Sequence, residues 1–340
     1  MPGYILRKVR SAIVGLGRIA SLLEDDPLRE KPATHAGALV SNPETVLVGA
    51  ADTDPERRRL FSERWGIPAV YEDIEEMLER TSPDILHICT DPSQHLSMLE
   101  SGVAHRVPLI LCEKPLAWSL REARRMLRII EGSGSRLMVN HERRYALDYV
   151  HARDVVASGL YGELRSIRGA LFMGERRTPR DTLLHDGTHM LDIVRFLTGG
   201  DVSSIACRGE PETSGALILI SYRCGGAPIY LEVGGGRDHL VFELDLSFER
   251  GRIRVGNGLY EEFVSDASPL YADMRSLRPV ELSFPKTEYF KRMIEDAVRV
   301  VRTGSEPVSS GSDALAVMEA IYAAIKRARS PLSPFRSRRL

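Results

Sequence analysis

The sequence predicts an α/β domain followed by an α+β domain: a doubly wound parallel sheet comes first, and an open, mainly antiparallel sheet follows. Up to about residue 140, short apolar runs alternate with segments of helical periodicity, which is the pattern of right-handed β–α–β units. Beyond that point, strand-like runs follow each other with few helices between them, as in an antiparallel sheet. Because 340 residues exceed what one ordinary core accommodates, we expect one domain over residues 1–140 and a second over residues 141–330.

The strands expected in the first domain are short and apolar, and turns or helix starts follow them. Asp54 and Pro55 mark one helix start, because the aspartate can cap the helix and the proline fits its first position. The segment 119–131 carries apolar side chains at helical spacing. We therefore expect strands at 10–14, 46–51, 84–89, 108–112 and 137–139, and helices at 55–64, 74–78, 92–100 and 119–131.

The second half is expected to form a sheet that one helix interrupts. This helix covers about residues 188–197 and ends at Gly199 and Gly200, since glycine favours the turn that closes a helix. Another helix, about 145–158, precedes the sheet, and two helices end the chain. We expect strands at 164–173, 216–222, 229–233, 240–248 and 252–255, and the final helices at 288–303 and 313–328.

The composition is that of a soluble globular protein, with 43% hydrophobic and 27% charged residues. Its 46 basic and 47 acidic residues nearly balance, so there is no electrostatic basis for binding nucleic acid. No stretch approaches the roughly twenty apolar residues that span a bilayer. The four cysteines show no close pairing, which fits a reduced compartment. We therefore expect a cytoplasmic protein with neither a membrane nor a nucleic-acid partner.

A glycine turn follows the first expected strand. Gly15, Gly17 and Ala20 fit the pattern G-x-G-x-x-(G/A), with Arg18 and Ile19 inside it. The first glycine permits the tight turn, the second lets the backbone approach a pyrophosphate, and the small third residue lets helix and strand pack closely. The N–H groups of the helix that we expect to open here would face the anion. The pattern predicts a dinucleotide-binding domain of the Rossmann type, and a plain glycine turn is the alternative.

The second expected strand ends at Asp52. A carboxylate at this place can hydrogen-bond the ribose 2′-hydroxyl of NAD, and it would repel the 2′-phosphate of NADP. The distance from the glycines is longer than the usual ~20 residues, because a charged loop at 24–32 is inserted. Arg57, at the start of the next helix, could pair with a phosphate. We therefore expect NAD as the cofactor, with NADP possible.

Three further segments carry residues suited to hydride transfer. Oxidising a secondary alcohol needs a base for the hydroxyl proton, which suits histidine, and a group that holds and polarises the oxygen, which suits lysine. Lys114 lies at the end of an expected strand, and the carboxyl ends of such strands border the dinucleotide crevice. The candidates are Thr90, Pro92 and His95 in one segment, Glu113 and Lys114 in the next, and His185, Asp186 and His189 in the third.

The residues proposed for hydride transfer could instead have structural roles. Lys114 could be a surface lysine, and His95 could cap or pack its helix. His185 and His189 are four residues apart and lie on one face if their helix begins that early, so they could bind a metal. No HExxH pattern or nearby cysteine pair supports that, and we expect no metal.

Arg143, Arg144 and Tyr145 come just after the last strand of the first domain. They could reach the same cleft and bind substrate, or they could form a solvated helix start. Both interpretations stay open on the sequence.

Taken together, these features resemble the family of glucose–fructose oxidoreductase, inositol dehydrogenase and MocA (Gfo/Idh/MocA) over nearly the full length of the chain. The matching segments are 15–20, 48–52, 90–95, 113–117, 185–192 and 303–307. The resemblance implies a Rossmann domain and then a domain with an open antiparallel sheet that often serves in dimer or tetramer assembly. It also implies NAD(P)-dependent oxidation or reduction of a hydroxyl group on a sugar, an inositol or a related polyol.

The resemblance also assigns individual residues. Lys114 matches the family's lysine that contacts substrate and nicotinamide, and His189 matches its catalytic histidine. The family commonly has an aspartate four residues before that histidine, where this chain has His185. Asp186 is shifted by one position and would face another direction on a helix. Either His185 takes over the orienting role, or the proton relay is different.

We therefore expect an NAD(P)-dependent dehydrogenase that acts on CH–OH groups and forms a homodimer or homotetramer. Lys114 would position the oxygen, His189 would be the general base, and His185 or Asp186 would orient it. Two alternatives stay open: a glycosidase or lyase that recycles its NAD, and a non-catalytic protein that senses the cofactor. The residues expected to contact the cofactor are Gly15, Gly17, Arg18, Ile19, Ala20, Asp52, Thr90, Pro92, His95, Glu113 and Lys114.

Overall fold

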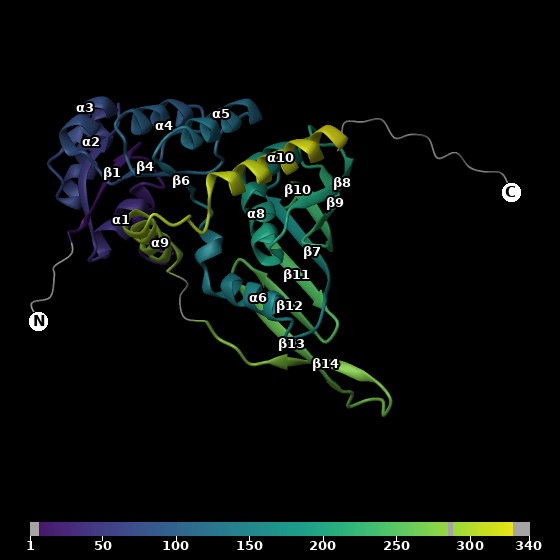
Figure 1. Cartoon of the computed structure of the whole chain (residues 1–340). Coiled ribbons are helices and arrows are strands. Elements are labelled where there is room, and N and C mark those ends of the chain that lie inside the picture. Colours follow the sequence, from purple (N-terminus) through teal and green to yellow (C-terminus); the bar gives the residue numbers. More distant parts are fainter. Residues whose placement is uncertain (1–6, 285–287, 329–340) are drawn as a thin grey trace, which may run out of the picture. The chain divides into compact units, whose positions relative to one another are not determined.

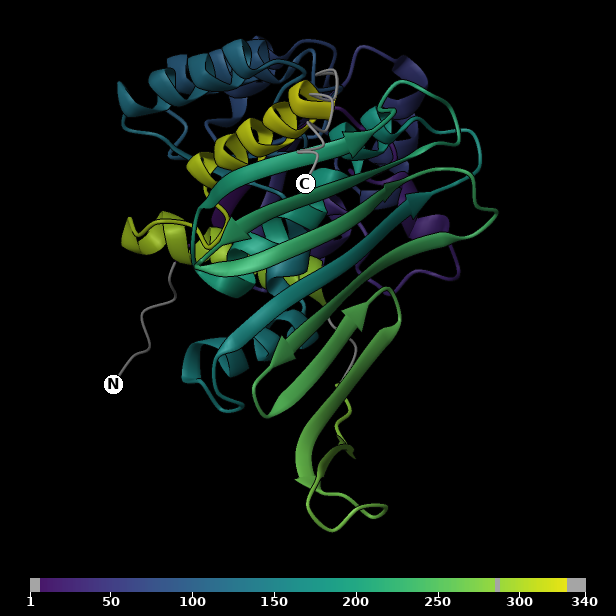
Figure 2. The same ribbon diagram turned by 90° about the vertical axis from the view of Figure 1, so that its right-hand side faces the viewer.

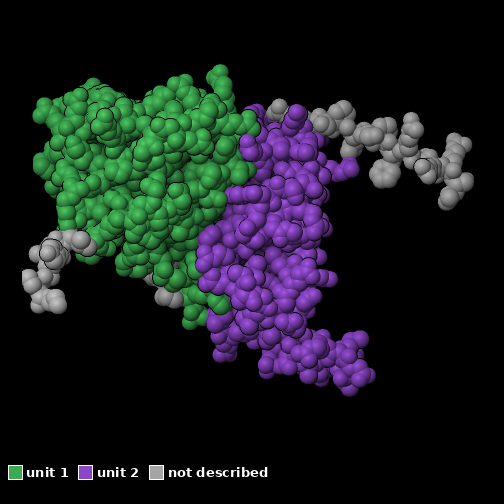
Figure 3. All heavy atoms as spheres, viewed as in Figure 1, with its two compact units in different colours: residues 1–152, 283–318 green, residues 153–282, 319–340 purple. Residues whose placement is uncertain are grey.

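The computed structural model describes residues 7–284 and 288–328, so the outermost parts of both expected domains lie outside the described residues. The chain forms two compact units, which Figure 3 shows in different colours. The first unit comprises residues 1–152 and 283–318, and the second comprises residues 153–282 and 319–340.

The first unit contains the predicted parallel sheet, with six strands in the order β3-β2-β1-β4-β5-β6 (Figure 1). The chain runs outward from β1 through β2 to β3, and then returns to the other side of β1 with β4. The ends of β1 and β4 therefore form the switch point at which such sheets bind dinucleotides. The strands are β1 (Val9–Val14), β2 (Thr45–Ala51), β3 (Val70–Tyr71), β4 (Ile85–Ile88), β5 (Leu109–Cys112) and β6 (Arg136–Val139).

Side-chain caps begin several helices of this unit, as the sequence suggested. The Asp54 carboxylate accepts hydrogen bonds from the backbone N–H groups of Glu56 and Arg57, and the Ser119 hydroxyl accepts one from Glu122. The helices are α1 (His35–Ser41), α2 (Pro55–Trp65), α3 (Ile74–Thr81), α4 (His95–Ala104), α5 (Leu120–Glu131) and α9 (Tyr289–Thr303), with 3-10 turns η1 (Leu22–Asp25) and η2 (Glu142–Tyr145).

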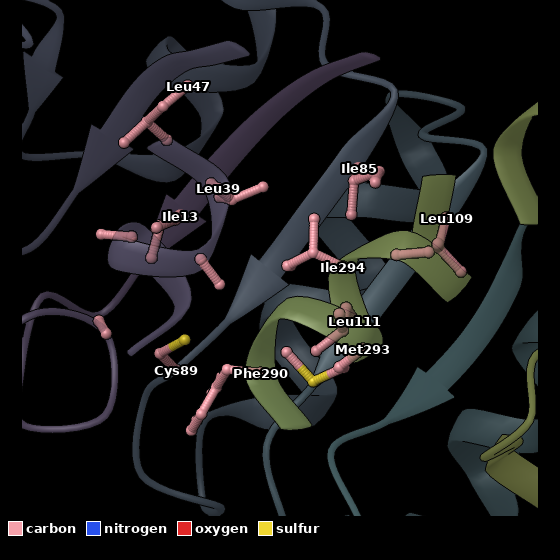
Figure 4. Close-up of a cluster of buried hydrophobic side chains, with 14 of the residues drawn as sticks. Ile13, Leu39, Leu47, Ile85, Cys89, Leu109, Leu111, Phe290, Met293 and Ile294 are labelled. Carbon is pink, nitrogen blue, oxygen red and sulfur yellow. The ribbon is translucent and has the colours of Figure 1, made fainter. Parts of the chain in front are cut away.

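The helix α9 corrects the expected domain boundary. We expected residues 141–330 to form the second domain, but residues 283–318 belong to the first unit. Phe290, Met293 and Ile294 of α9 point into the same buried cluster as Ile85 and Leu111 of the sheet (Figure 4). An apolar stripe at helical spacing has to be buried against something, and here it covers one face of the parallel sheet. The roles that we assigned to the two domains stay predictions.

The second unit contains an eight-stranded sheet in the order β14-β13-β12-β11-β7-β10-β9-β8 (Figure 2). All its pairs are antiparallel except β7 with β10, which is parallel. This confirms the mainly antiparallel sheet. Its strands are β7 (Leu164–Met173), β8 (Val202–Gly209), β9 (Leu217–Cys224), β10 (Ala227–Gly234), β11 (Leu240–Phe248), β12 (Gly251–Gly256), β13 (Leu259–Ala267) and β14 (Arg275–Val280).

Two helices, α7 (Pro179–His185) and α8 (Gly187–Thr198), pack against one face of this sheet. Strand β9 shows the alternation that results: Ile218 and Ile220 are buried, whereas Leu217 and Leu219 are exposed. The chain passes from the first unit to the second within α6 (Leu147–Ser158), returns to the first between residues 282 and 283, and passes to the second again within α10 (Gly311–Ala328). Among the helices described, none combines the length and the apolar character needed to cross a bilayer.

Candidate active site

A pocket of about 400 Å³ lies in the first unit, at the carboxyl ends of β1, β2 and β4. Parallel α/β sheets bind their ligands at this edge. Four residues predicted to contact the cofactor line the pocket, and they come from three separate segments: Gly15, Gly17, Asp52 and Thr90. The structure therefore brings together the glycine turn, the end of the second strand and the loop after the fourth.

The geometry of the turn requires glycine at position 15 and leaves open space beside position 17. Gly15 has a φ of +84°, and a Cβ atom there would lie 2.8 Å from the backbone nitrogen of Thr90, so only glycine fits. A Cβ atom on Gly17 would meet nothing nearer than the Arg57 guanidinium, at 4.0 Å. The space beside Gly17 is thus open to a group such as a pyrophosphate, and Arg57 adds a positive charge at its border.

The turn opens a shorter helix than the sequence predicted. The N–H of Ser21 donates to the Gly17 carbonyl at 3.1 Å and that of Leu23 to the Arg18 carbonyl at 2.9 Å, which makes little more than one helical turn. The inserted segment then delays α1 until His35. Glu24 holds the insertion in place, because its Oε1 accepts a hydrogen bond from the N–H of Ala33 at 2.8 Å. The helix that we expected to open at the glycines is therefore limited to this turn and the 3-10 turn η1.

The remaining residues of the glycine pattern have different places. Ala20 is fully buried, and its carbonyl accepts the N–H of Ala36 at 3.0 Å, so the small residue does allow α1 to approach. Arg18 and Ile19 belong to the single helical turn and are not among the residues that line the pocket. Their contact with the cofactor stays a prediction.

Asp52 joins the glycine turn to the second strand. Its Oδ2 accepts a hydrogen bond from the N–H of Leu16 at 2.7 Å and lies 3.6 Å from Nη1 of Arg57. Its Oδ1 accepts the N–H of Asp54 at 2.9 Å. A carboxylate oxygen has two lone pairs, so both oxygens can still accept from a ribose hydroxyl. The aspartate therefore shapes the turn in addition to its predicted role toward the cofactor.

The loop after β4 carries Thr90, Pro92 and His95. The Oγ1 atom of Thr90 is buried and has no hydrogen-bond partner among residues 7–284 and 288–328, although Thr90 lines the pocket. Burying a hydroxyl without a partner is costly, and a bound cofactor could supply one. Pro92 precedes α4, which begins at His95 and not at residue 92 as expected.

His95 links two loops. Its Nδ1 lies 3.2 Å from the Leu116 carbonyl and its Nε2 lies 3.2 Å from the Thr90 carbonyl. Burial lowers the pKa of His95, and the two carbonyl contacts only partly offset this. These contacts favour the packing interpretation of His95, in which it holds the loop that carries Thr90.

Glu113 and Lys114 follow β5, and the Glu113 carboxylate lies in a buried polar cluster. Its Oε1 is 2.8 Å from Nε2 of His35 and 2.6 Å from Nδ2 of Asn140, and its Oε2 accepts the N–H of Lys114 at 3.2 Å. Burial alone would raise the pKa of Glu113, but the hydrogen bonds and the charge of its partners outweigh it and leave the pKa below its usual value. The sequence did not reveal this cluster, because Glu113, His35 and Asn140 come from three distant segments.

The second unit holds His185, Asp186 and His189. His185 ends α7, Asp186 forms the junction, and α8 begins at Gly187, so the two histidines do not lie on one continuous helix. Asp186 contacts His185 through Oδ1, 3.1 Å from Nδ1, and accepts Nη1 of Arg177 on Oδ2 at 2.6 Å. His189 lies in the first turn of α8 and is buried.

Arg143, Arg144 and Tyr145 form the turn η2 and not the start of a helix. Arg144 is buried and pairs with Asp313, with its Nη1 3.1 Å from Oδ2. The Tyr145 hydroxyl donates to Oδ2 of Asp296 at 2.8 Å. Arg143 also has a contact within the first unit, with its Nη1 3.5 Å from the Tyr149 hydroxyl. The role of the three residues toward a substrate stays a prediction.

Comparison with known proteins agrees with this geometry. Residues 9–141 match a family model described as an oxidoreductase family with an NAD-binding Rossmann fold. The chain is 28% identical over 317 residues to a D-apiose dehydrogenase of Rhizobium rhizogenes. This alignment covers 84% of this chain and 89% of that protein. It is 23% identical over 351 residues to an inositol 2-dehydrogenase of Rhizobium meliloti, with 94% and 96% covered.

A solved structure shows the same fold over both units. It is an oxidoreductase from Agrobacterium radiobacter in complex with NAD+, L-tartaric acid and magnesium, with a TM-score of 0.75 at 24% identity. The alignment covers 94% of this chain and 96% of that one. The glycine turn, the switch-point pocket and the Glu113-Lys114 pair lie within residues 9–141, and this part of the chain belongs to the Gfo/Idh/MocA family of oxidoreductases with an NAD-binding Rossmann fold.

Proposed function

We propose that the protein is a dehydrogenase that transfers a hydride between NAD(P) and a secondary hydroxyl group of a sugar, an inositol or a related polyol. The observation that carries this proposal is the pocket lined by Gly15, Gly17, Asp52 and Thr90. It lies at the edge of the same parallel sheet whose strand β5 ends at Cys112, two residues before Lys114. The relatives named as D-apiose dehydrogenase and inositol 2-dehydrogenase support the substrate class.

The bound nicotinamide would accept or donate the hydride, and the chain would handle the proton and the oxygen. Lys114 would donate a hydrogen bond to the reacting oxygen and stabilise the negative charge that develops on it. His189 would take the hydroxyl proton as the general base. These roles rest on the family resemblance of both residues.

Asp186 and His185 support a modified proton relay. The carboxylate of Asp186 contacts Nδ1 of His185, and Arg177 fixes the same carboxylate from the other side. The His185 side chain is half exposed, with 51% of its surface accessible. A ring that is held at Nδ1 presents its Nε2 atom outward, which suits proton exchange with solvent. We propose that His185 replaces the family's aspartate in the relay and that Asp186 orients it.

Turnover by purified protein tests the proposal. NADH or NADPH formation would be followed with a panel of pentoses, inositols, other aldoses and uronic acids, with NAD and NADP in parallel. We expect at least one polyol or sugar to be oxidised, and substitution Lys114→Ala to lower kcat at least 100-fold with NAD affinity retained. Retained turnover in this variant would remove Lys114 from the mechanism.

Two outcomes would point to the alternatives. Product formation without accumulation of NADH, from a tightly held cofactor, would indicate a glycosidase or lyase that recycles NAD. Bound NAD without any turnover on the panel would indicate a cofactor-sensing protein.

We also propose a homodimer or homotetramer that assembles through the sheet of the second unit and works in the cytoplasm. Leu219 and Tyr230 are exposed on neighbouring strands of that sheet, at 55% and 52%. They border a shallow depression of about 370 Å³. All four cysteines are free and buried, which fits a reducing compartment.

A further inference from the structure

The fully buried pair His35 and His87 stands out among the polar groups of the first unit. His87 lies in β4, where its neighbours in register are Ile13 of β1 and Leu111 of β5, both apolar. His35 opens α1, and its ring packs edge-on against Phe290 of α9 at 5.5 Å between centroids. Two imidazoles in an apolar core are costly unless their polar atoms are used.

The two rings contact each other through like atoms. Nδ1 of His35 lies 2.9 Å from Nδ1 of His87, so one of these nitrogens carries a proton and the other accepts it. The Nε2 atom of His35 lies 2.8 Å from the Glu113 carboxylate. Because an ionised carboxylate can only accept, Nε2 of His35 must carry a hydrogen.

The environment of His87 decides which of the two rings donates the hydrogen bond between the Nδ1 atoms. Complete burial, with His35 adjacent, lowers the pKa of His87 well below its usual value, so His87 is neutral. Its Nε2 has no hydrogen-bond partner in the described part of the chain. A buried N–H without a partner is rarer than a buried acceptor without one, so the hydrogen of His87 belongs on Nδ1. His87 therefore donates to His35, and His35 donates to Glu113.

We propose that this one-directional chain, His87 to His35 to Glu113, positions Lys114 for the reaction, so that His35 and His87 are positioning residues. On its other side, Oε2 of Glu113 accepts the backbone N–H of Lys114 at 3.2 Å, so this bond points toward the carboxylate from the opposite end. The bonds from His87 to His35 and from His35 to Glu113 point the same way and polarise each other, which strengthens the hold on the carboxylate. The positive charge of Lys114 also contributes to lowering the pKa of Glu113. The inference rests on the proposed function, in which Lys114 holds the reacting oxygen.

Other titratable groups around Glu113 leave this assignment unchanged. The thiols of Cys89 and Cys112 are buried, which raises the pKa of both well above the usual value and keeps them neutral. His95 of α4 has a lowered pKa because it is buried. Burial raises the pKa of Glu142 in η2, and the negative charge of Glu113 adds to this effect.

Steady-state kinetics of four variants test the proposal. His35→Leu breaks both bonds of the chain, whereas His35→Gln keeps a donor toward Glu113. Glu113→Gln keeps the shape but removes the charge. His105→Gln is the matched control, because His105 caps the C-terminus of α4 and its ring has Ser101 and Glu75 as polar partners, outside the Glu113 cluster. NADH titration and thermal unfolding of each variant identify those that fail to fold.

We expect His35→Leu to lower kcat about 10- to 100-fold while the affinity for NADH changes less than about twofold. His35→Gln should recover most of the loss, and His105→Gln should match the wild-type protein. Glu113→Gln should also lower kcat, because the side chain can then accept a hydrogen bond at only one of its two terminal atoms. A purely structural role of His35 would leave kcat low in His35→Gln as well as in His35→Leu.

Nitrogen NMR of labelled histidine checks the chain without turnover. We expect a neutral His87 with its hydrogen on Nδ1 between about pH 6 and 9, and loss of that bonded hydrogen signal in His35→Leu. A hydrogen on Nε2 of His87, or unchanged kinetics in His35→Leu and Glu113→Gln, would overturn the inference. Absence of turnover in the wild-type protein would instead overturn the proposed function, and the positioning role with it.

Discussion

At the scale of single residues, the border of the cofactor pocket carries two opposite charges. The Asp52 carboxylate suits a free ribose hydroxyl, and the Arg57 guanidinium, 3.6 Å away, suits a phosphate. Arg57 is half exposed, so it can turn toward a ligand, while the N–H groups of Leu16 and Asp54 still hold the buried Asp52 carboxylate. Asp52 thus suits NAD, and Arg57 offers a positively charged partner to the 2′-phosphate of NADP.

The first residue-scale prediction concerns Arg57→Ala. We expect the affinity for NADP to fall about 10-fold or more, since a hydrogen bond to a charged group is lost, and the affinity for NAD to stay the same. Fluorescence titration with NADPH and NADH measures both. Arg59→Ala is the control, because Arg59 pairs with Glu56 and Glu63 on the same helix. Equal losses for both cofactors would show that Arg57 only supports the fold of the pocket.

The second residue-scale prediction concerns the ion pair of Arg144 and Asp313. Burial alone would raise the pKa of Asp313, but Arg144 and Ser310 hold it well below its usual range. A group with a lowered pKa stabilises the fold above its unfolded pKa of about 3.9, and this contribution is lost as the pH falls below that value. We expect Asp313→Asn to reduce the free energy of unfolding by about 1–3 kcal/mol at pH 7.

Urea unfolding at several pH values measures this contribution. The difference between Asp313→Asn and the wild-type protein should shrink steadily below about pH 4. A difference that is the same at pH 7 and pH 3 would mean that the charge of Asp313 does not contribute.

At the scale of elements, the sequence predicted most of the parallel sheet and the helices between its strands. Apolar runs and the capping residue Asp54 are local signals, and α2 begins at Pro55 as they predicted. The helix α1 was missed because seven residues are too few for a periodic pattern. Strand β14 was missed because its residues are mostly exposed on both faces, so its polar and apolar positions do not alternate.

The sequence likewise predicted only part of the candidate site. The glycines, Asp52 and Thr90 lie in one pocket as expected, because they end strands of one parallel sheet. His35, His87 and Asn140 were not singled out. A histidine inside the apolar run of β4 was the one signal available, and only the tertiary structure shows that it reaches Glu113 through His35.

The element-scale prediction concerns α9. Met293 is fully buried in the cluster that covers the parallel sheet. We expect Met293→Ala to lower the free energy of unfolding by about 2–5 kcal/mol, because it removes apolar contacts and leaves a cavity. Glu295→Ala, an exposed position on the same helix, should change it by less than about 0.5 kcal/mol. Urea unfolding of the two variants gives both values, and equal effects would contradict the role of α9 in this core.

At the scale of the whole molecule, the prediction is that two exposed side chains of the second sheet hold copies of the chain together. Leu219→Glu combined with Tyr230→Glu should shift the protein toward monomers, because burying a carboxylate in an apolar interface is costly. Light scattering coupled to size-exclusion chromatography measures the mass. Leu28→Glu is the control, since Leu28 is almost fully exposed in the first unit. An unchanged mass in the double variant would place the interface elsewhere or show that the protein is monomeric.

The place of α9 has a consequence for how the chain folds as the ribosome makes it. The six strands of the first unit have been synthesised by residue 139, but the helix that covers one face of their sheet begins only at residue 289. An intervening stretch of 149 residues, from 140 to 288, must therefore emerge before that apolar face can be closed. During this interval the nascent sheet exposes the surface that Phe290 and Met293 later bury. Incomplete chains are consequently the form of this protein most prone to aggregate and most in need of a chaperone.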